Sequence, residues 1–271
     1  MPGRKPPPFL PNPQPNSRMK QRPTFPARMD SSVAAPKAKP LPSTNLPQGL
    51  GMDSMAVRQR MVQKLAGQGL SDPRVLAAMG RVERHRFVDS ALVNQAYEDT
   101  SLPIGLGQTI SKPGVVSRMI ELLCQATEGK LGRVLEIGTG CGYQAAVLSE
   151  VATEVYSIER LRGLHEKARE NLRFLRLANL HLLLGDGMLG YAQGAPYAAI
   201  IAAAGGDALP TAWTDQLAVG GRLVAPVAQR ASGGAGGVVA QALVVVDKTS
   251  QGLRQTILEA VHFVPLKSGL A

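Results

Sequence analysis

Residues 134–143 read VLEIGTGCGY, and this stretch decides how the chain folds. Val134–Ile137 is typical of a buried strand, and three glycines follow it before a helical pattern begins at Tyr143. Glycines let the chain turn sharply and let a ligand approach the backbone without a Cβ in the way. The stretch predicts a strand, a glycine turn and a helix. Taken alone, the turn is equally compatible with a tight connection that binds nothing.

Strand and helix patterns alternate on the C-terminal side of this turn. The expected strands are Arg133–Ile137, Glu154–Ile158, Leu180–Leu184, Ala198–Ala203, Arg222–Val227, Val238–Val246 and Thr256–Phe263. The expected helices among them are Tyr143–Val151, Arg162–Leu175 and Pro210–Leu217. Such alternation predicts an α/β fold with a mostly parallel seven-stranded sheet. Because Asp247–Gln255 is too short for a helical crossover, the last two strands should form a terminal antiparallel hairpin.

Two further helices are expected before the sheet. The first covers Met55–Gly67, and the second opens at Ser71-Asp72-Pro73, with Ser71 as N-cap and proline in the first turn. The apolar side chains of the second helix share one face, at Val75, Leu76, Met79 and Val82. We expect the two helices to form an N-terminal cap beside the main sheet.

Two carboxylates that follow the glycine turn in the chain help to identify the ligand expected there. Its spacing is G-x-G-x-G, not the G-x-G-x-x-G of dinucleotide sites. Glu159 ends the second strand and Asp186 ends the third, at the sheet edge where α/β proteins bind ligands. Each acid alone is compatible with a solvated strand end. In this order, Glu159 is placed for the hydroxyls of a ribose and Asp186 for the amino group of an adenine.

A ligand with ribose and adenine but no phosphate fits acids and glycines, and we expect S-adenosylmethionine, with S-adenosylhomocysteine as product. Glu136 is expected to help hold its ammonium group, directly or through water. The expected cofactor-binding residues are Glu136, Gly138, Thr139, Gly140, Gly142, Glu159, Asp186 and Gly187.

The segment Leu102–Pro113 is too rich in glycine for a strand and too apolar for a solvated linker. Ser111 and Pro113 precede an expected helix, Gly114–Leu123, as N-cap and first-turn residue. Two interpretations stay open. Ser111 only caps the helix, or its hydroxyl and the adjacent N–H groups bind a carboxylate, which the helix dipole favours.

Several of these runs, in this order, resemble the protein-L-isoaspartate O-methyltransferases over roughly residues 55–270. The resembling runs are Leu102–Ser111, Val134–Tyr143, Ile158–Arg160, Gly185–Gly187 and Val261–Leu266. Gln108–Ser111 is the most specific of them, because generic methyltransferases lack it. The resemblance implies a Rossmann-like sheet with N-terminal cap helices.

The resemblance also implies a reaction: methylation of the free carboxylate of L-isoaspartyl residues in damaged proteins and peptides, which initiates repair through a succinimide. By motif position, Ser111 is the family's active-site serine, with Thr109 and Ile110 in the same pocket. Val264 belongs to a segment similar to the one that closes over the substrate. At Ala202–Gly206 the chain departs from the family's Thr-Ala pair, which puts the contacts at the methionine end of the cofactor in doubt.

Other functions remain as alternatives. A nucleic-acid methyltransferase is suggested by the basic N-terminal region, but neither an Asn-Pro-Pro-aromatic motif nor a Pro-Cys nucleophile occurs. Cys141 lies inside the glycine turn, the wrong place for nucleophilic attack. A non-catalytic cofactor-binding module is the second alternative, and the presence of Gln108–Ser111 argues against it. The glycine spacing disfavours a nicotinamide dehydrogenase.

The net charge of +10 is concentrated at the N-terminus. Residues 1–50 hold eight Lys or Arg, one acid and thirteen of the 20 prolines, a net charge of +7. We expect residues 1–52 to be a disordered basic Pro-rich extension and residues 53–271 to be the methyltransferase domain. The extension is open to three interpretations: weak contact with nucleic acid or another polyanion, a dispensable extension, or an upstream start codon with the real start near Met52 or Met55.

The cysteine content fits a reducing compartment, and we expect a cytoplasmic enzyme. Cys124 and Cys141 form no disulfide framework, and no His or Cys spacing indicates a metal site. The longest apolar runs are strand-sized, so no contact with a membrane is expected. No feature demands a dimer, and we expect a monomer.

Overall fold

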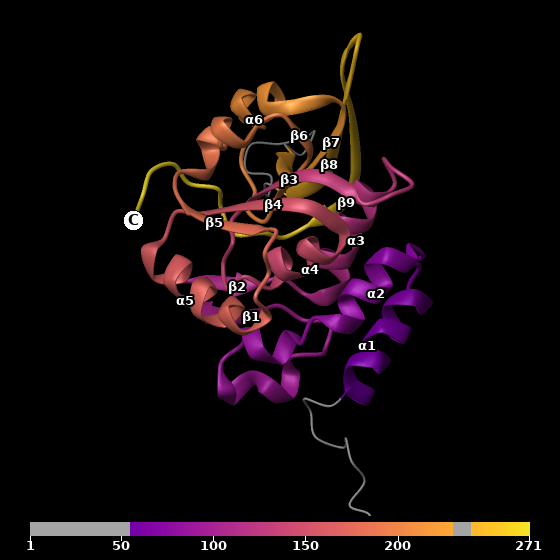
Figure 1. The fold of residues 1–271 in the computed structure, drawn as a ribbon, viewed down its shortest axis with the longest axis vertical. Coiled ribbons are helices and arrows are strands. Elements are labelled where there is room, and N and C mark those ends of the chain that lie inside the picture. The colour runs from indigo at the N-terminus through magenta and orange to yellow at the C-terminus, as the bar shows by residue number, and fades with distance from the viewer. Residues whose placement is uncertain (1–54, 230–239) are drawn as a thin grey trace, which may run out of the picture. The chain divides into compact units, whose positions relative to one another are not determined.

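The computed structural model of the chain describes residues 55–229 and 240–271. A seven-stranded sheet with the order β5-β4-β3-β6-β7-β8-β9 forms its centre (Figure 1). The strands are β3 (Leu131–Ile137), β4 (Ala152–Glu159), β5 (Leu180–Leu184), β6 (Tyr197–Ala202), β7 (Leu217–Gln229), β8 (Ala240–Thr249) and β9 (Gly252–Val261). The first five in this order are parallel, and β8 is antiparallel to both β7 and β9. The predicted fold class is confirmed.

Helices cover both faces of the sheet, which explains why Val134, Leu135 and Ile137 of β3 are all buried. On one face Val134 packs in a core with α3 (Pro113–Cys124), α4 (Tyr143–Val151) and α5 (Arg162–Leu172). On the other, Leu135 and Ile137 pack in a second core with Trp213 of α6 (Thr211–Gln216). Alternate residues of one strand thus belong to two different cores.

Several element boundaries differ from the sequence-based expectation, most clearly at the β8–β9 hairpin and at the end of α5. The hairpin of β8 and β9 is tighter than expected, because Thr249 pairs with Gly252 and the strands continue through residues 247–255. The helix expected over Arg162–Leu175 ends at Leu172 and continues as a 3₁₀ turn to Leu175. The predicted extension at residues 1–52 lies outside the described residues, and the division into domains stays a prediction.

The prediction that Leu102–Pro113 contains no strand is wrong. This segment forms a small antiparallel hairpin of β1 (Leu102–Gly105) and β2 (Gln108–Ile110). Its glycines lie at the turn, where Gly105 forms the last strand pair, with Gln108. Gly105, Leu106 and Gly107 all have positive φ, at 97°, 52° and 69°. Leucine rarely adopts a positive φ, whereas glycine does so without steric cost. Gly105 and Gly107, on either side of Leu106, therefore allow the chain to reverse direction here.

The two cap helices are α1 (Met55–Gly67) and α2 (Pro73–Arg81), and they pack against α3 and α4. The expected cap of α2 was wrong by one residue: Asp72, not Ser71, accepts from the N–H groups of Arg74 and Val75. Pro73 occupies the first helical position, which makes Asp72 the N-cap. The N–H and hydroxyl of Ser71 donate to Glu121 of α3 instead, at 2.7 and 3.2 Å.

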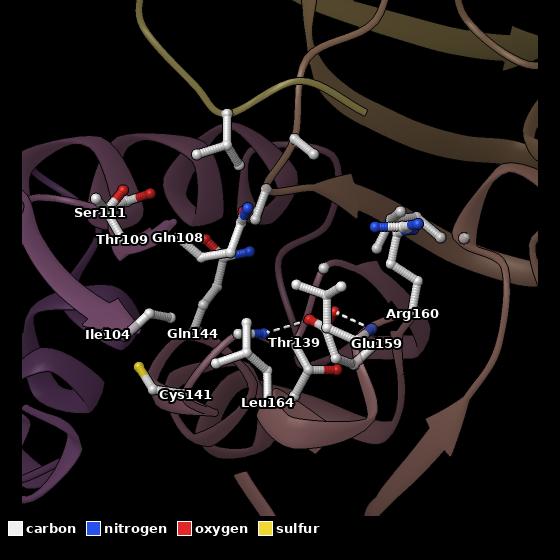
Figure 2. Close-up of a pocket in the computed structure, with 18 of the residues that line it drawn as sticks. Ile104, Gln108, Thr109, Ser111, Thr139, Cys141, Gln144, Glu159, Arg160 and Leu164 are labelled. Carbon is white, nitrogen blue, oxygen red and sulfur yellow. Dashed lines mark hydrogen bonds between the residues drawn. The ribbon is translucent and has the colours of Figure 1, made fainter. Parts of the chain in front are cut away.

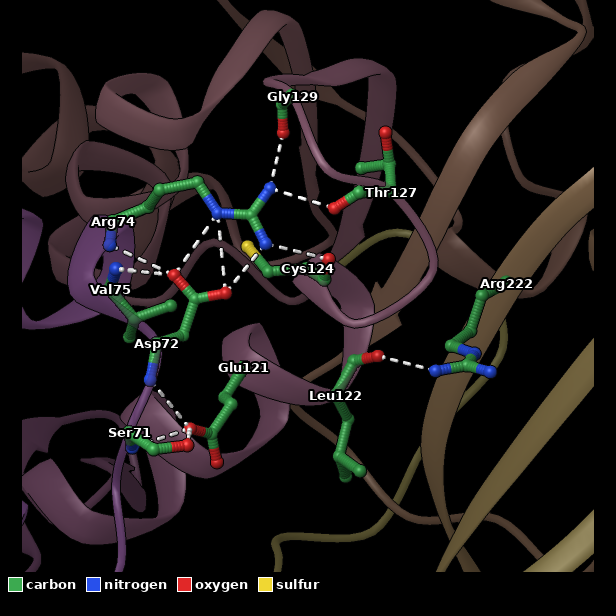
Figure 3. Close-up of polar contacts among 10 residues, drawn as sticks. All are labelled: Ser71, Asp72, Arg74, Val75, Glu121, Leu122, Cys124, Thr127, Gly129 and Arg222. Carbon is green, nitrogen blue, oxygen red and sulfur yellow. Dashed lines mark hydrogen bonds and ion pairs between the residues drawn. The ribbon is translucent and has the colours of Figure 1, made fainter.

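A polar network joins this cap to the core (Figure 3). The Arg74 guanidinium pairs with the Asp72 carboxylate at 2.6 Å and donates to the carbonyls of Cys124 (2.8 Å), Thr127 (2.9 Å) and Gly129. Carbonyls at a helix C-terminus lack intrahelical donors, and a cation there also complements the helix dipole. Arg74 of α2 therefore supplies the C-terminal cap of α3. None of the helices in the described ranges is long and apolar enough to cross a membrane.

Arg74→Met should lower the free energy of unfolding by about 2–3 kcal/mol, because hydrogen bonds to several acceptors lose their donor together. Urea denaturation followed by circular dichroism measures this loss. Arg81→Met is the control: the Arg81 side chain is 65% exposed beside Glu150, so its loss should cost less than about 0.5 kcal/mol. Equal losses in the two variants would contradict the capping role of Arg74.

Candidate functional site

A cavity opens at the carboxyl ends of the central strands, between the sheet and the β1–β2 hairpin. In Figure 2, Thr109 and Ser111 lie at one side of it and Glu159 and Arg160 at the other, with Gln144 between them. The apolar part of its lining includes Ile104, Ile110, Val116, Ile137, Ile158 and Leu164. The cavity therefore combines apolar walls with a comparable share of polar groups. Small-molecule sites use such polar groups to orient a ligand.

The glycine turn has the conformation that its sequence predicts. Gly138, Gly140 and Gly142 all have positive φ, at 89°, 58° and 93°. A Cβ on Gly142 would lie 2.7 Å from a methyl carbon of Leu172, so this glycine allows α4 to pack closely on α5. Gly142 faces α5 rather than the cavity, whereas Gly138, Thr139 and Gly140 line the cavity.

The Glu159 carboxylate ties this turn to the end of β4. Its two oxygens accept from the N–H of Gly140 and the N–H of Leu161, each at 2.9 Å, and the residue is only 5% exposed. A carboxylate has about four lone-pair positions, so two further donors can still reach it. Glu159 is held in place with acceptor capacity directed to the cavity that it lines.

Glu136 lies behind the turn and is fully buried. One of its oxygens, Oε2, accepts from the Ser157 hydroxyl, which also contacts Thr139 Oγ1 at 2.6 Å. Burial raises the pKa of the Glu136 carboxyl to about 8, although the Ser157 hydrogen bond acts in the opposite direction. Its other oxygen, Oε1, and the buried amide nitrogen of Gln144 meet no hydrogen-bond geometry among the described residues, although Gln144 is near enough to lower the pKa of Glu136. Gln144 lines the cavity, and an unpartnered buried polar atom there indicates a group that a ligand completes.

Ser111 lies at the opposite side of the cavity, and the prediction that it caps α3 is wrong. The N-cap of α3 is Lys112, whose side chain makes no capping hydrogen bond. The N–H of Gly114 donates instead to Asp99 Oδ1, at 2.7 Å. Within the part of the chain that the structure describes, the Ser111 hydroxyl makes no hydrogen bond, and it lines the cavity. A second, outer cavity beside His262 and Arg118 also borders Ser111.

The C-terminal segment closes one side of the cavity. Val264, Pro265, Leu266 and Lys267 line it, and the segment pairs with the end of β6 through Gly205. In Figure 1 it runs from β9 across to β5, where the N–H of Gly269 donates to Asp186 Oδ2 at 2.6 Å. Asp186 also caps the next turn through the N–H of Met188, at 2.9 Å. Neither hydrogen bond to Asp186 was predicted from the sequence.

Most of the predicted site residues meet around one cavity. Those that line it are Thr109, Ile110, Ser111, Gly138, Thr139, Gly140, Glu159, Gly187 and Val264. Glu136, Gly142 and Asp186 do not line it. Sequence reasoning missed Gln144, whose position on the first turn after the glycines was the available signal, and the apolar contacts of Ile104 and Leu164. Cys141 lines the cavity but is buried, and burial raises the pKa of its thiol to about 11.

No group of three or more His, Cys, Asp or Glu among residues 55–229 and 240–271 is arranged to hold a metal ion. The sequence matches the family model described as protein-L-isoaspartate(D-aspartate) O-methyltransferase over residues 56–271.

Relatives with the name protein-L-isoaspartate O-methyltransferase are similar over most of the chain. One from Methylibium petroleiphilum is 55% identical and covers 91% of this chain and 96% of its own length. One from Leptothrix cholodnii is 56% identical, over 91% of this chain and 84% of its own.

Solved structures agree. One with the same name has a TM-score of 0.69 and 29% identity, and covers 79% of this chain and 67% of its own. A Plasmodium falciparum structure, described as a complex of such a protein with S-adenosyl-L-homocysteine, has a TM-score of 0.65. It is 22% identical over 78% of this chain and 98% of its own, so it supports the fold.

Glu136→Gln should remove a pH-dependent cost to stability. A carboxyl whose pKa rises on folding stabilises the fold fully below its unfolded value, 4.5, and this contribution is lost as pH rises through about 8. The stability of Glu136→Gln relative to the unsubstituted protein should therefore increase by on the order of 1 kcal/mol per pH unit. Urea denaturation between pH 5.5 and 8.5 measures it, and a difference that stays constant over this range would refute the buried, protonated carboxyl.

Proposed function

The chain belongs to the protein-L-isoaspartate(D-aspartate) O-methyltransferase family, and we propose that its cavity performs this reaction with Ser111 as the residue that orients the substrate. The enzyme transfers a methyl group from S-adenosylmethionine to the free carboxylate of L-isoaspartyl residues in damaged proteins and peptides. The methyl ester then forms a succinimide, and repair begins.

The main support for the role of Ser111 is that its hydroxyl lines the cavity and makes no hydrogen bond among the described residues. The side chain borders both the inner cavity and the outer one, and the first turn of α3 is capped without it. A hydroxyl donor at such a junction suits a carboxylate that enters from outside and must stop in one orientation. Thr109, Ile110 and Val264 line the same cavity and are proposed to surround the substrate.

The residues on the opposite side fit the cofactor. Glu159, with acceptor capacity left over, is proposed for the ribose hydroxyls, and the backbone of Gly138, Thr139 and Gly140 for close contact with the nucleoside. The unpartnered atoms Glu136 Oε1 and Gln144 Nε2 are an acceptor and a donor for the charged methionine end. When bound, S-adenosylmethionine supplies a methyl group on a sulfonium, which is already an activated donor.

Asp186, Gly187 and Gly142 complete the proposed cofactor site in different ways. Asp186 is proposed for the adenine amino group, in addition to its two backbone donors, because a carboxylate accepts up to about four hydrogen bonds. Gly187 leaves room beside Ile137, whose methyl carbon lies 2.5 Å from the place of a Cβ. Gly142 acts by letting α4 pack against Leu172, which fixes the turn.

The chain needs no general base for this reaction. A carboxylate with a pKa near 4 is already ionised at neutral pH. Its weakness is hydration, and the apolar walls at Ile104, Ile110 and Val116 exclude water from the place where it must react. A neutral serine hydroxyl orients the carboxylate without the strong charge that would make it less nucleophilic. Positioning in the line of transfer can lower the barrier by up to roughly 7–11 kcal/mol in ideal cases.

We further propose, from the sequence, that the protein is a cytoplasmic monomer and that residues 1–52 contact polyanions weakly. What supports the last point is the net charge of +7 over residues 1–50 against +3 over the rest. The same basic residues are what a nucleic-acid methyltransferase would use, so that alternative is carried into the test below.

Methyl transfer to an isoaspartyl peptide, compared with its normal aspartyl twin, tests the function. The unsubstituted enzyme should methylate only the isoaspartyl form. Ser111→Ala should lower kcat/KM by about 100-fold, because the carboxylate loses its orienting donor, and should leave the calorimetric affinity for S-adenosylhomocysteine within about twofold. Labelled methyl groups provide the measurement.

Ser268→Ala is the matched control, since Ser268 is exposed and does not line the cavity. Transfer to nucleic acid but to neither peptide would support the nucleic-acid alternative. Cofactor binding without any transfer would support the non-catalytic module. Unchanged kcat/KM in Ser111→Ala would remove Ser111 from the mechanism.

A further inference from the structure

The first turn of α3 has one N–H that requires an acceptor from elsewhere. Pro113, the first helical residue, has no N–H, and those of Val115 and Val116 donate to the Lys112 carbonyl at 3.1 and 3.2 Å. The remaining N–H belongs to Gly114, and it donates to Asp99, fifteen residues earlier in the chain. A helix start that carries no side-chain cap of its own thus takes its acceptor from another segment.

The Asp99 carboxylate contacts Lys112 and Gly114, which both follow Ser111 closely in the chain. One carboxylate oxygen accepts from the Gly114 N–H at 2.7 Å, and the other lies 4.0 Å from the Lys112 ammonium. The carboxylate fills the space over Gly114 so closely that a Cβ there would lie 2.9 Å from it. Ser111 is joined directly to Lys112, so the position of its backbone depends on this contact.

The segment that carries Asp99 is itself fixed by a buried cation. The Arg84 side chain is fully buried, and its guanidinium donates to the carbonyls of Ala96 at 2.8 Å and Thr100 at 3.5 Å, on either side of Asp99. The same guanidinium lies 4.8 Å from the ring centre of Tyr143, the first residue of α4 after the glycine turn. Arg84 therefore connects the segment behind Ser111 with the segment behind the cofactor turn.

We propose that Asp99 is a positioning residue for methyl transfer: by capping α3 from a distance, it leaves the Ser111 hydroxyl free for the substrate carboxylate. This inference rests on the proposed function. Without Asp99, the Gly114 N–H needs another acceptor, and the Ser111 hydroxyl is the side-chain oxygen of the helix-start sequence that can turn to it. Ser111 would then cap α3, and its hydroxyl would no longer donate to the substrate carboxylate.

A double-mutant cycle tests the proposal. Asp99→Ala should lower kcat/KM for the isoaspartyl peptide by about 10- to 100-fold, with the affinity for S-adenosylhomocysteine within about twofold. Asp99→Asn keeps an acceptor for the Gly114 N–H and should retain most activity. In a Ser111→Ala background, Asp99→Ala should cause no further loss, because its effect acts through the serine. The affinity of the isoaspartyl peptide for the S-adenosylhomocysteine complex is also measured in the unsubstituted enzyme, the two single variants and the double variant. This affinity gives a second comparison of the four proteins where methyl transfer is too slow to measure.

Two more variants separate positioning from folding. Gly114→Ala forces the Asp99 carboxylate away and should reproduce the loss in Asp99→Ala, including its disappearance in the Ser111→Ala background. Glu98→Ala, at the exposed neighbouring acid, should have no effect. Equal fractional losses with and without Ser111 would overturn the inference, as would full activity in Asp99→Ala. An unsubstituted enzyme that transfers nothing to the isoaspartyl peptide would instead overturn the proposed function.

Discussion

The contacts of the Glu159 carboxylate are the constraint on which the site depends. Through the N–H groups of Gly140 and Leu161, this one side chain joins the turn after β3 to the chain after β4. Both strands lie side by side in the parallel sheet, so their carboxyl ends reach the same edge. The turn can then hold glycines at positive φ without drifting away from the sheet. A cavity with a fixed wall results, and the remaining residues are arranged against it.

Glu136 of β3 and Glu159 of β4 have different surroundings. Glu159 is tied to backbone N–H groups at the cavity wall, whereas Glu136 is enclosed by the sheet and α4, and burial raises its pKa to about 8. Glu159 had been predicted to contact the ribose, and Glu136 to help hold the ammonium group, directly or through water. The difference comes from their surroundings: backbone N–H groups donate to both oxygens of Glu159, whereas burial away from water raises the pKa of Glu136.

Local patterns in the sequence were enough to predict the sheet and its helices, because apolar periodicity and the glycine turn act over a few residues. The β1–β2 hairpin was missed because its glycines, read as strand breakers, lie in the turn around Leu106. Contacts between distant segments were missed for a different reason. Asp99 reaches Gly114 across fifteen residues and Gly269 reaches Asp186 across 83, and no spacing rule connects such pairs. The cap of α3 was therefore assigned to Ser111, the nearest candidate.

The two buried cysteines can report local unfolding of the segments in which they lie. Cys141 lies in the glycine turn and Cys124 at the end of α3, where Arg74 binds its carbonyl. Each is at most 3% exposed, and burial raises the pKa of each thiol to about 11. At neutral pH neither presents a thiolate to a reagent in the closed structure. The rate at which each thiol is alkylated consequently measures how often its segment unfolds: Cys141 reports on the glycine turn, and Cys124 on the contact between α2 and α3.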